Sequence, residues 1–204
     1  MDKKITTFIF DCFGVVLSPV ISDWYRINRT NKGFVDKNFQ NLLKEFDLNN
    51  LSEDDIAMYF SKYEGMTLSK EKIQEEIDNG LKMDHVLVHM IQQLKNKGYK
   101  IALLTNANAS FFERKVYKVH PNFKDLFNEI VISSDIGMIK PNKDIFLYTL
   151  KKIDSTPEET LFIDDGKMNV EGAINLGING FVYTDSNSFK NYLKESGIKL
   201  ENKE

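Results

Sequence analysis

The chain has 204 residues, the size of one domain or of one domain with an insertion. Its 27 Lys and Arg residues nearly balance 30 Asp and Glu residues, for a net charge of -3. Such a balance does not indicate the basic surface that binds nucleic acid or anionic membranes, so we expect neither as a partner. The sequence leaves open whether the protein is a monomer or a homodimer.

The chain also lacks the features of secreted and membrane proteins. A single cysteine, Cys12, excludes an internal disulfide and fits a reducing compartment. No apolar run approaches the roughly 20 residues of a membrane span, and the N-terminus lacks the long apolar segment of a signal peptide. We therefore expect a cytoplasmic protein.

Five short apolar runs, bounded by polar or glycine residues, predict buried parallel strands. They lie at 5–10, 100–104, 130–132, 161–163 and 180–183. Between them, apolar residues at helical spacing predict helices at 85–97 and 144–153. Thr156 and Pro157 predict one capped turn before the fourth strand. The alternation of strands and helices predicts a doubly wound α/β sheet.

Residues 18–82 interrupt this alternation, because they contain helical patterns and no convincing strand. Ser52 and Asp55 are spaced as a capping box before a helix at 56–63. Ser69 is placed to cap a helix at 70–78 that ends near Gly80. We therefore predict an α/β core formed by 1–17 and 83–204, with a helical insertion at 18–82.

Polar residues follow the predicted strands, where α/β sheets bind their ligands. These residues are Asp11 after the first strand, Thr105 and Asn106 after the second, Lys140 in the loop after the third, and Asp164 and Asp165 after the fourth. Three acids, a hydroxyl and an amine are thus expected to converge in one crevice.

This combination suits phosphoryl transfer, which requires neutralised charge and in-line geometry. Asp11 would attack phosphorus and form an aspartyl-phosphate. Asp11 and Asp165 would bind Mg²⁺, which prefers oxygen ligands, and Asp164 would bond a water on that metal. Lys140 would screen the nucleophile and the phosphate, while Thr105 and the backbone N–H groups that follow it would hold a phosphoryl oxygen.

Four segments, in order and at matching spacing, resemble the motifs of haloacid dehalogenase superfamily hydrolases. They are 8–16 (FIFDCFGVV), 103–106 (LLTN), Lys140-Pro141 and 162–173 (FIDDGKMNVEGA), the last being the variant in which paired aspartates precede Asn169. The resemblance covers almost the whole chain. It implies a Rossmann-like core with a small all-helical cap inserted after the first strand. It also implies an activity close to that of small bacterial phosphatases acting on sugar phosphates.

The first motif departs from the family pattern at Phe13. Phosphatases of the family carry there a second aspartate, which protonates the leaving group and then activates water. The resemblance implies that the backbone carbonyl at this position also binds the metal, a role that Phe13 retains. Because general acid–base catalysis contributes about 10²–10⁴-fold, we predict slow turnover or a preference for leaving groups needing little protonation, such as acyl, aryl or anomeric phosphates.

Two other functions stay open. Dehalogenases of the family use the same aspartate without metal and carry an aromatic residue where Phe13 stands, but they lack paired acids in the fourth motif. The second alternative is a non-catalytic protein that binds a phosphorylated ligand after losing its acid. In the insertion, Trp24 and Arg26 are candidates for substrate contact, Arg26 by pairing with a second anionic group; such aromatic residues more often form the cap's own core.

Overall fold

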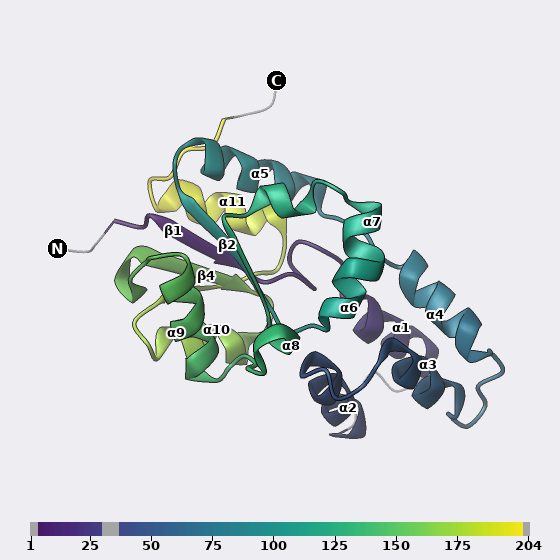
Figure 1. Cartoon of the computed structure of the whole chain (residues 1–204). Helices are drawn as coiled ribbons and strands as arrows, with labels where there is room; N and C mark the ends of the chain where they lie inside the picture. The colour runs from purple at the N-terminus through teal and green to yellow at the C-terminus, as the bar shows by residue number, and fades with distance from the viewer. Residues whose placement is uncertain (1–3, 30–36, 202–204) are drawn as a thin grey trace.

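The computed structural model describes residues 4–29 and 37–201 (Figure 1). Residues 1–3 and 202–204, which the sequence assigns to the core, and 30–36 of the insertion lie outside the described residues. No helix within the described ranges is both long and apolar enough to cross a membrane.

A five-stranded parallel sheet with strand order β3-β2-β1-β4-β5 forms the core of the fold. Its strands are β1 (Thr7–Phe10), β2 (Lys100–Thr105), β3 (Glu129–Ile132), β4 (Thr160–Asp164) and β5 (Asn179–Val182). All five predicted strands are confirmed, with ends shifted by one or two residues. β1 lies in the centre, where Ile9 pairs with Ala102 of β2 and with Phe162 of β4.

Helices cover both faces of the sheet, which explains why its central strands are mostly apolar between their ends (Figure 1). The helices and turns of this part are α5 (His85–Asn96), α6 (Ala109–Phe111), η1 (Phe112–Val116), α7 (Tyr117–Val119), η2 (Phe123–Leu126), α8 (Ser133–Ile136), α9 (Lys143–Lys152), η3 (Pro157–Glu159), α10 (Lys167–Ile174) and α11 (Ser186–Glu195). Phe8 and Phe10 pack with α5 and α11, whereas Ile9 points to the other face and packs with α9 and α10.

The predicted helices 85–97 and 144–153 are confirmed as α5 and α9. The turn before β4 differs from its prediction. It is a 3-10 turn, and the side chain of Thr156 does not cap it. Instead, the backbone carbonyl of Thr156 accepts hydrogen bonds from Glu159 N at 3.2 Å and from Thr160 Oγ1 at 2.8 Å. The prediction of a turn was therefore right and that of a side-chain cap was wrong.

Between β1 and α5 the described residues form helices and no strand, as predicted. They are α1 (Val20–Arg29), α2 (Lys37–Asp47), α3 (Glu53–Ser61) and α4 (Lys70–Asn79), and Figure 1 shows them gathered beside the sheet. Ser52 and Asp55 form the predicted capping box of α3, and Ser69 caps α4 through Lys72 N.

The two connections between these helices and the sheet run side by side. Leu17 forms isolated bridges to Phe13 and to Met83, and Ser18 N donates to Lys82 O at 2.8 Å. This pairing supports our proposal that the helical cap extends from 18 to 82.

Candidate active site

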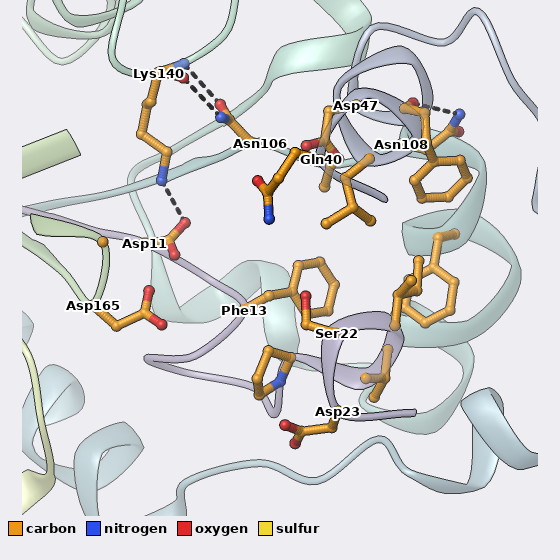
Figure 2. Close-up of a pocket in the computed structure, with 18 of the residues that line it drawn as sticks. Asp11, Phe13, Ser22, Asp23, Gln40, Asp47, Asn106, Asn108, Lys140 and Asp165 are labelled. Carbon is orange, nitrogen blue, oxygen red and sulfur yellow. Dashed lines mark hydrogen bonds and ion pairs between the residues drawn. The ribbon is translucent and has the colours of Figure 1, made fainter. Parts of the chain in front are cut away.

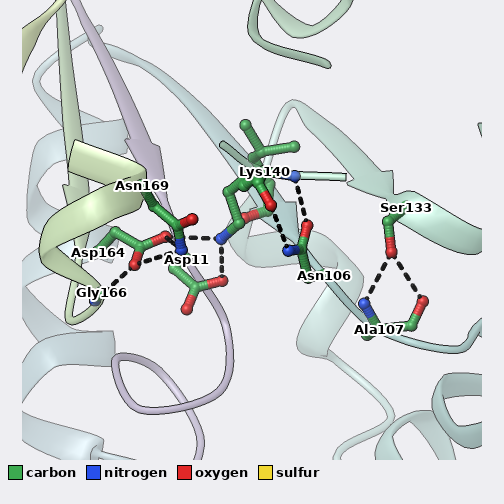
Figure 3. Close-up of polar contacts among 9 residues, drawn as sticks. Asp11, Asn106, Ala107, Ser133, Lys140, Asp164, Gly166 and Asn169 are labelled. Atoms are coloured by element: carbon green, nitrogen blue, oxygen red, sulfur yellow. Dashed lines mark hydrogen bonds and ion pairs between the residues drawn. The ribbon is translucent and has the colours of Figure 1, made fainter. Parts of the chain in front are cut away.

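The carboxyl ends of three neighbouring strands bring the predicted polar residues together (Figure 3). Asp11 directly follows β1, Thr105 ends β2, and Asp164 ends β4 with Asp165 next to it. Lys140 approaches them from the turn between α8 and α9. The predicted convergence at this edge of the sheet is thus present in the structure.

Lys140 is the electrostatic centre of the site. Its ammonium is buried and donates to Asp11 Oδ1 at 2.5 Å, to Asp164 Oδ2 at 2.7 Å and to Leu104 O at 3.0 Å, which uses all its donors. Burial opposes its charge, but the two carboxylates outweigh this effect and raise the pKa of Lys140. Burial also raises the pKa of Asp11, and the Lys140 charge acts against that rise. Lys140 is therefore a fixed positive charge at the carboxylate of Asp11.

Asp164 is fully buried and already committed to hydrogen bonds. Besides Lys140, it accepts from Gly166 N at 2.7 Å and from Asn169 Nδ2 at 3.0 and 3.2 Å. Asn169 therefore orients Asp164. Asp165 is the exposed member of the trio, and one carboxylate oxygen from each of Asp11, Asp164 and Asp165 lies within 4.8 Å of the others. Such a set of oxygen donors suits a small divalent cation.

Two further observations show that the site is shaped for an added group. Thr105 Oγ1 is buried and has no hydrogen-bond partner among the described residues, which is rare for a hydroxyl group in a folded protein. Gly14 has a φ of +102°, and a side chain at this position would collide with the carboxylate of Asp165. The residues present thus fit a Mg²⁺ ion with a phosphoryl group beside it.

Asn106 holds the loop that carries Lys140. Its Nδ2 donates to Lys140 O at 3.0 Å, and its Oδ1 accepts from Lys140 N at 2.8 Å. Both ends of the amide are occupied in this way, so the side chain of Asn106 positions Lys140. The backbone N–H of Asn106 remains the group for the predicted contact with phosphate.

A cavity of about 570 Å³ opens from these residues toward the cap (Figure 2). Its wall is partly apolar, with Phe13 of the first motif beside the side chains of Val20, Ile21, Leu43, Phe46 and Phe111. Polar groups from the cap also reach it, namely Ser22, Asp23, Arg26, Gln40 and Asp47. The cavity thus joins the carboxylates of the sheet to helices α1 and α2.

The two cap residues predicted to contact substrate lie in different places. Arg26 lines the cavity and its Nη2 is 2.8 Å from Asp23 Oδ1. Trp24 does not line it. Its indole is buried, stacks on Phe60 with ring centroids 4.8 Å apart, and donates to Glu76 Oε2 at 2.9 Å. The structure therefore corrects the expectation for Trp24, which belongs to the aromatic core of the cap.

Three residues at the junction of cap and core escaped the sequence analysis. The side chain of Asp47, at the end of α2, lines the cavity. Asn108 and Ser133, which follow β2 and β3, hold the backbone at that end of α2. Asn108 and Ser133 could have been predicted near the site from their positions just after strands. No local pattern distinguishes Asp47 from other acids of the cap.

Comparison with known proteins agrees with the geometry. The profile of the family described as haloacid dehalogenase-like hydrolase matches residues 5–177. The chain is 34% identical over 106 residues to the sesquiterpene phosphatase astK of Aspergillus oryzae, an alignment that covers 52% of this chain and 53% of that protein. It is 24% identical over 190 residues to the pyrophosphatase PpaX of Bacillus mycoides, covering 85% and 81%. It is 26% identical over 154 residues to a D-ribitol-5-phosphate phosphatase of Bacteroides thetaiotaomicron, covering 69% and 70%.

Solved structures share the fold. A predicted HAD-like family hydrolase from Porphyromonas gingivalis matches with a TM-score of 0.72 and 22% identity, over 97% of this chain and 100% of that one. A HAD family enzyme from Bacteroides thetaiotaomicron, solved as a magnesium complex, matches with a TM-score of 0.67 and 21% identity, over 89% and 94%. Because the family profile also covers most of the sequence, this chain belongs to the haloacid dehalogenase-like hydrolases.

Proposed function

We propose that this protein is a Mg²⁺-dependent phosphatase that hydrolyses a small phosphorylated metabolite, of the sugar-phosphate type, through an aspartyl-phosphate on Asp11. The observation that carries the proposal is the buried Lys140 ammonium, which bridges Asp11 and Asp164 while the carboxylate of Asp165 stays accessible beside them. A dehalogenase, which handles no phosphate, would have no use for the paired aspartates.

Each residue has a definite task in this reaction. Asp11 and Asp165, with the backbone carbonyl of Phe13, would hold the Mg²⁺, and Asp164 would bond a water on it. The cation supplies positive charge to the non-bridging phosphoryl oxygens. Lys140 keeps Asp11 ionised for attack, and the hydroxyl of Thr105, which has no partner among the described residues, donates to a phosphoryl oxygen.

Several related proteins support a phosphate substrate. The three relatives described above are named as phosphatases of a sesquiterpene compound, of pyrophosphate and of D-ribitol 5-phosphate. A cavity of about 570 Å³ is of the size that holds a small metabolite. Arg26 on its wall is placed to attract a second anionic group of the substrate.

The proposal is tested by hydrolysis of p-nitrophenyl phosphate. We expect turnover with Mg²⁺, none with EDTA, and a loss of at least about 10³-fold in Asp11→Asn, because an amide cannot act as the nucleophile. Asp54→Asn is a matched control, since Asp54 is an exposed cap residue paired with Lys70. Chloride release from 2-chloropropionate in EDTA would instead identify a dehalogenase. Binding of inorganic phosphate without any hydrolysis would identify a non-catalytic binder.

A further inference from the structure

The cavity contains few groups that can transfer a proton. Among the described residues, the titratable side chains on its wall are Asp11, Asp23, Arg26, Asp47, Lys140 and Asp165. Asp11 is the proposed nucleophile, Asp165 a proposed metal ligand, and Lys140 is held between two carboxylates. Arginine does not lose its proton in proteins, and Asp23 is hydrogen-bonded to Arg26. This leaves Asp47.

The core fixes the backbone on both sides of this carboxyl group. Ser133 Oγ donates to Asp47 O at 2.7 Å, and Asn108 Nδ2 donates to Phe46 O and to Leu51 O, both at 3.2 Å. Asn108 follows β2, which ends at Thr105, and Ser133 follows β3, whose connection to α9 carries Lys140. The end of α2 is therefore docked on the same framework as Asp11 and Lys140, although α2 belongs to the cap.

The Asp47 side chain faces the cavity without a hydrogen-bond partner among the described residues. In Figure 2 it lies with Gln40 across the cavity from Asp11 and Asp165. Gln40 cannot exchange a proton, so Asp47 is the side chain on this part of the wall that can do so. Burial raises the pKa of Asp47 to about 7, and the charge of Lys140 reduces the rise. Its place at the C-terminal end of a helix also disfavours the negative form.

We propose that Asp47 is the general acid and base of this enzyme, taking over the task that the missing aspartate at Phe13 performs in related phosphatases. The inference rests on the proposed phosphatase function. It assigns to a cap residue a catalytic role on the leaving-group side, opposite the attacking oxygen of Asp11.

The two half-reactions then balance. In the first, an oxygen of Asp11 attacks phosphorus, the bond from phosphorus to the substrate oxygen breaks, and that oxygen takes the proton of Asp47 to leave as an alcohol. In the second, a water molecule attacks the aspartyl-phosphate, Asp47 takes a proton from it, and the Asp11 carboxylate departs with the electron pair. Asp47 ends protonated, as it began.

The test compares leaving groups in the isosteric variant Asp47→Asn. p-Nitrophenolate leaves without a proton, whereas the alkoxides of glycerol 2-phosphate and ribitol 5-phosphate need one. We compare kcat/KM, because it reports the first half-reaction alone, whereas kcat also contains the second, which uses Asp47 with every substrate. We expect kcat/KM on the better alkyl phosphate to fall about 10²–10⁴-fold, and kcat/KM on p-nitrophenyl phosphate to change by less than about 10-fold. Asp54→Asn, again an exposed cap acid, should change neither.

The pH profile separates an acid from a residue that only positions the substrate. In the wild type, kcat/KM on the alkyl phosphate should fall as the pH rises through about 7, because the first half-reaction requires the protonated form of Asp47. This alkaline limb should be absent in Asp47→Asn. The charged groups facing the same cavity, Asp11, Asp23, Arg26, Lys140 and Asp165, remain in the variant.

Three outcomes would overturn the role of Asp47. They are equal losses of kcat/KM on both kinds of substrate, an unchanged kcat/KM on the alkyl phosphate, and a wild type that hydrolyses p-nitrophenyl phosphate but no alkyl phosphate. If the wild type hydrolyses no phosphate ester with Mg²⁺, the proposed function itself fails, and the inference fails with it.

Discussion

At the scale of single residues, Phe13 lines the cavity with an apolar ring at a position where related phosphatases carry a hydrophilic group. Its ring lies edge-on to Phe111 and Phe112, with centroid distances of 5.8 and 5.7 Å. These contacts join the first motif to the segment after β2. Phe13 thus contributes to packing between the motifs while providing no proton, so in the proposed mechanism the proton for the leaving group comes from another side chain.

Restoring the acid at this position tests that view. We expect the double variant Phe13→Asp, Asp47→Asn to recover at least about 10-fold of the alkyl phosphatase activity lost in Asp47→Asn. The cost is stability, because the carboxylate loses the aromatic contacts of Phe13. We estimate a loss on the order of 2 kcal/mol, below the range for a fully buried Phe because Phe13 is only partly buried. Steady-state kinetics and urea unfolding measure the two effects.

Phe13→Leu in the same background is the matched control, since it removes the ring but adds no acid. Equal rates in the Leu and Asp double variants would show that position 13 offers no route for the proton.

Most of the site was predictable at this scale, because Asp11, Thr105 and Asp165 follow their strands directly and Lys140 lies in a short loop. Their positions depend on local sequence and on the common edge of a parallel sheet. Which cap side chains face the cavity depends on how the cap helices pack against the core. For that reason the sequence did not distinguish Trp24, which packs inside the cap, from Asp47, which faces the cavity.

At the scale of elements, an ion cluster ties the cap to the core. Arg114 of η1 contacts Glu53 of α3 and Asp78 of α4, with Nη1 to Asp78 Oδ2 at 2.6 Å and Nε to Glu53 Oε1 at 3.1 Å. Both carboxylates are largely buried, with 14% and 16% of their side-chain surface exposed. Because the guanidinium joins two cap helices to one core segment, it fixes all three.

Arg114→Ala should therefore destabilise the protein more than the loss of an ordinary surface pair. It leaves two largely buried carboxylates without their cation, and we expect the free energy of unfolding to fall by about 1–3 kcal/mol. Lys70→Ala, which removes the more exposed pair with Asp54, is the control and should change the free energy of unfolding much less. Urea unfolding measures both, and equal effects would contradict a special role for the cluster.

At the scale of the whole molecule, the parallel core was predictable because both of its faces are covered. Full burial gives strands a continuous apolar pattern, and Gly98, with a φ of +87°, follows the end of α5. The segment from α6 to η2 was not predictable in the same way. Its short α, π and 3-10 pieces succeed one another without a single period, and tertiary packing of Phe112 and Phe123 holds them in place.

The hydrogen bonds from Ser133 and Asn108 attach the end of α2 to the core, although this helix belongs to the cap in the chain order. In native-state hydrogen exchange, we expect the amides of the last turn of α2 to open with β2 and β3 rather than with α3 and α4. In Asn108→Ala, these amides should exchange faster and open with α3 and α4. Asn50→Ala, which removes an exposed contact with Glu45, should not change their exchange. The cooperative boundary of this protein would then cross α2, so that one helix belongs to two unfolding units.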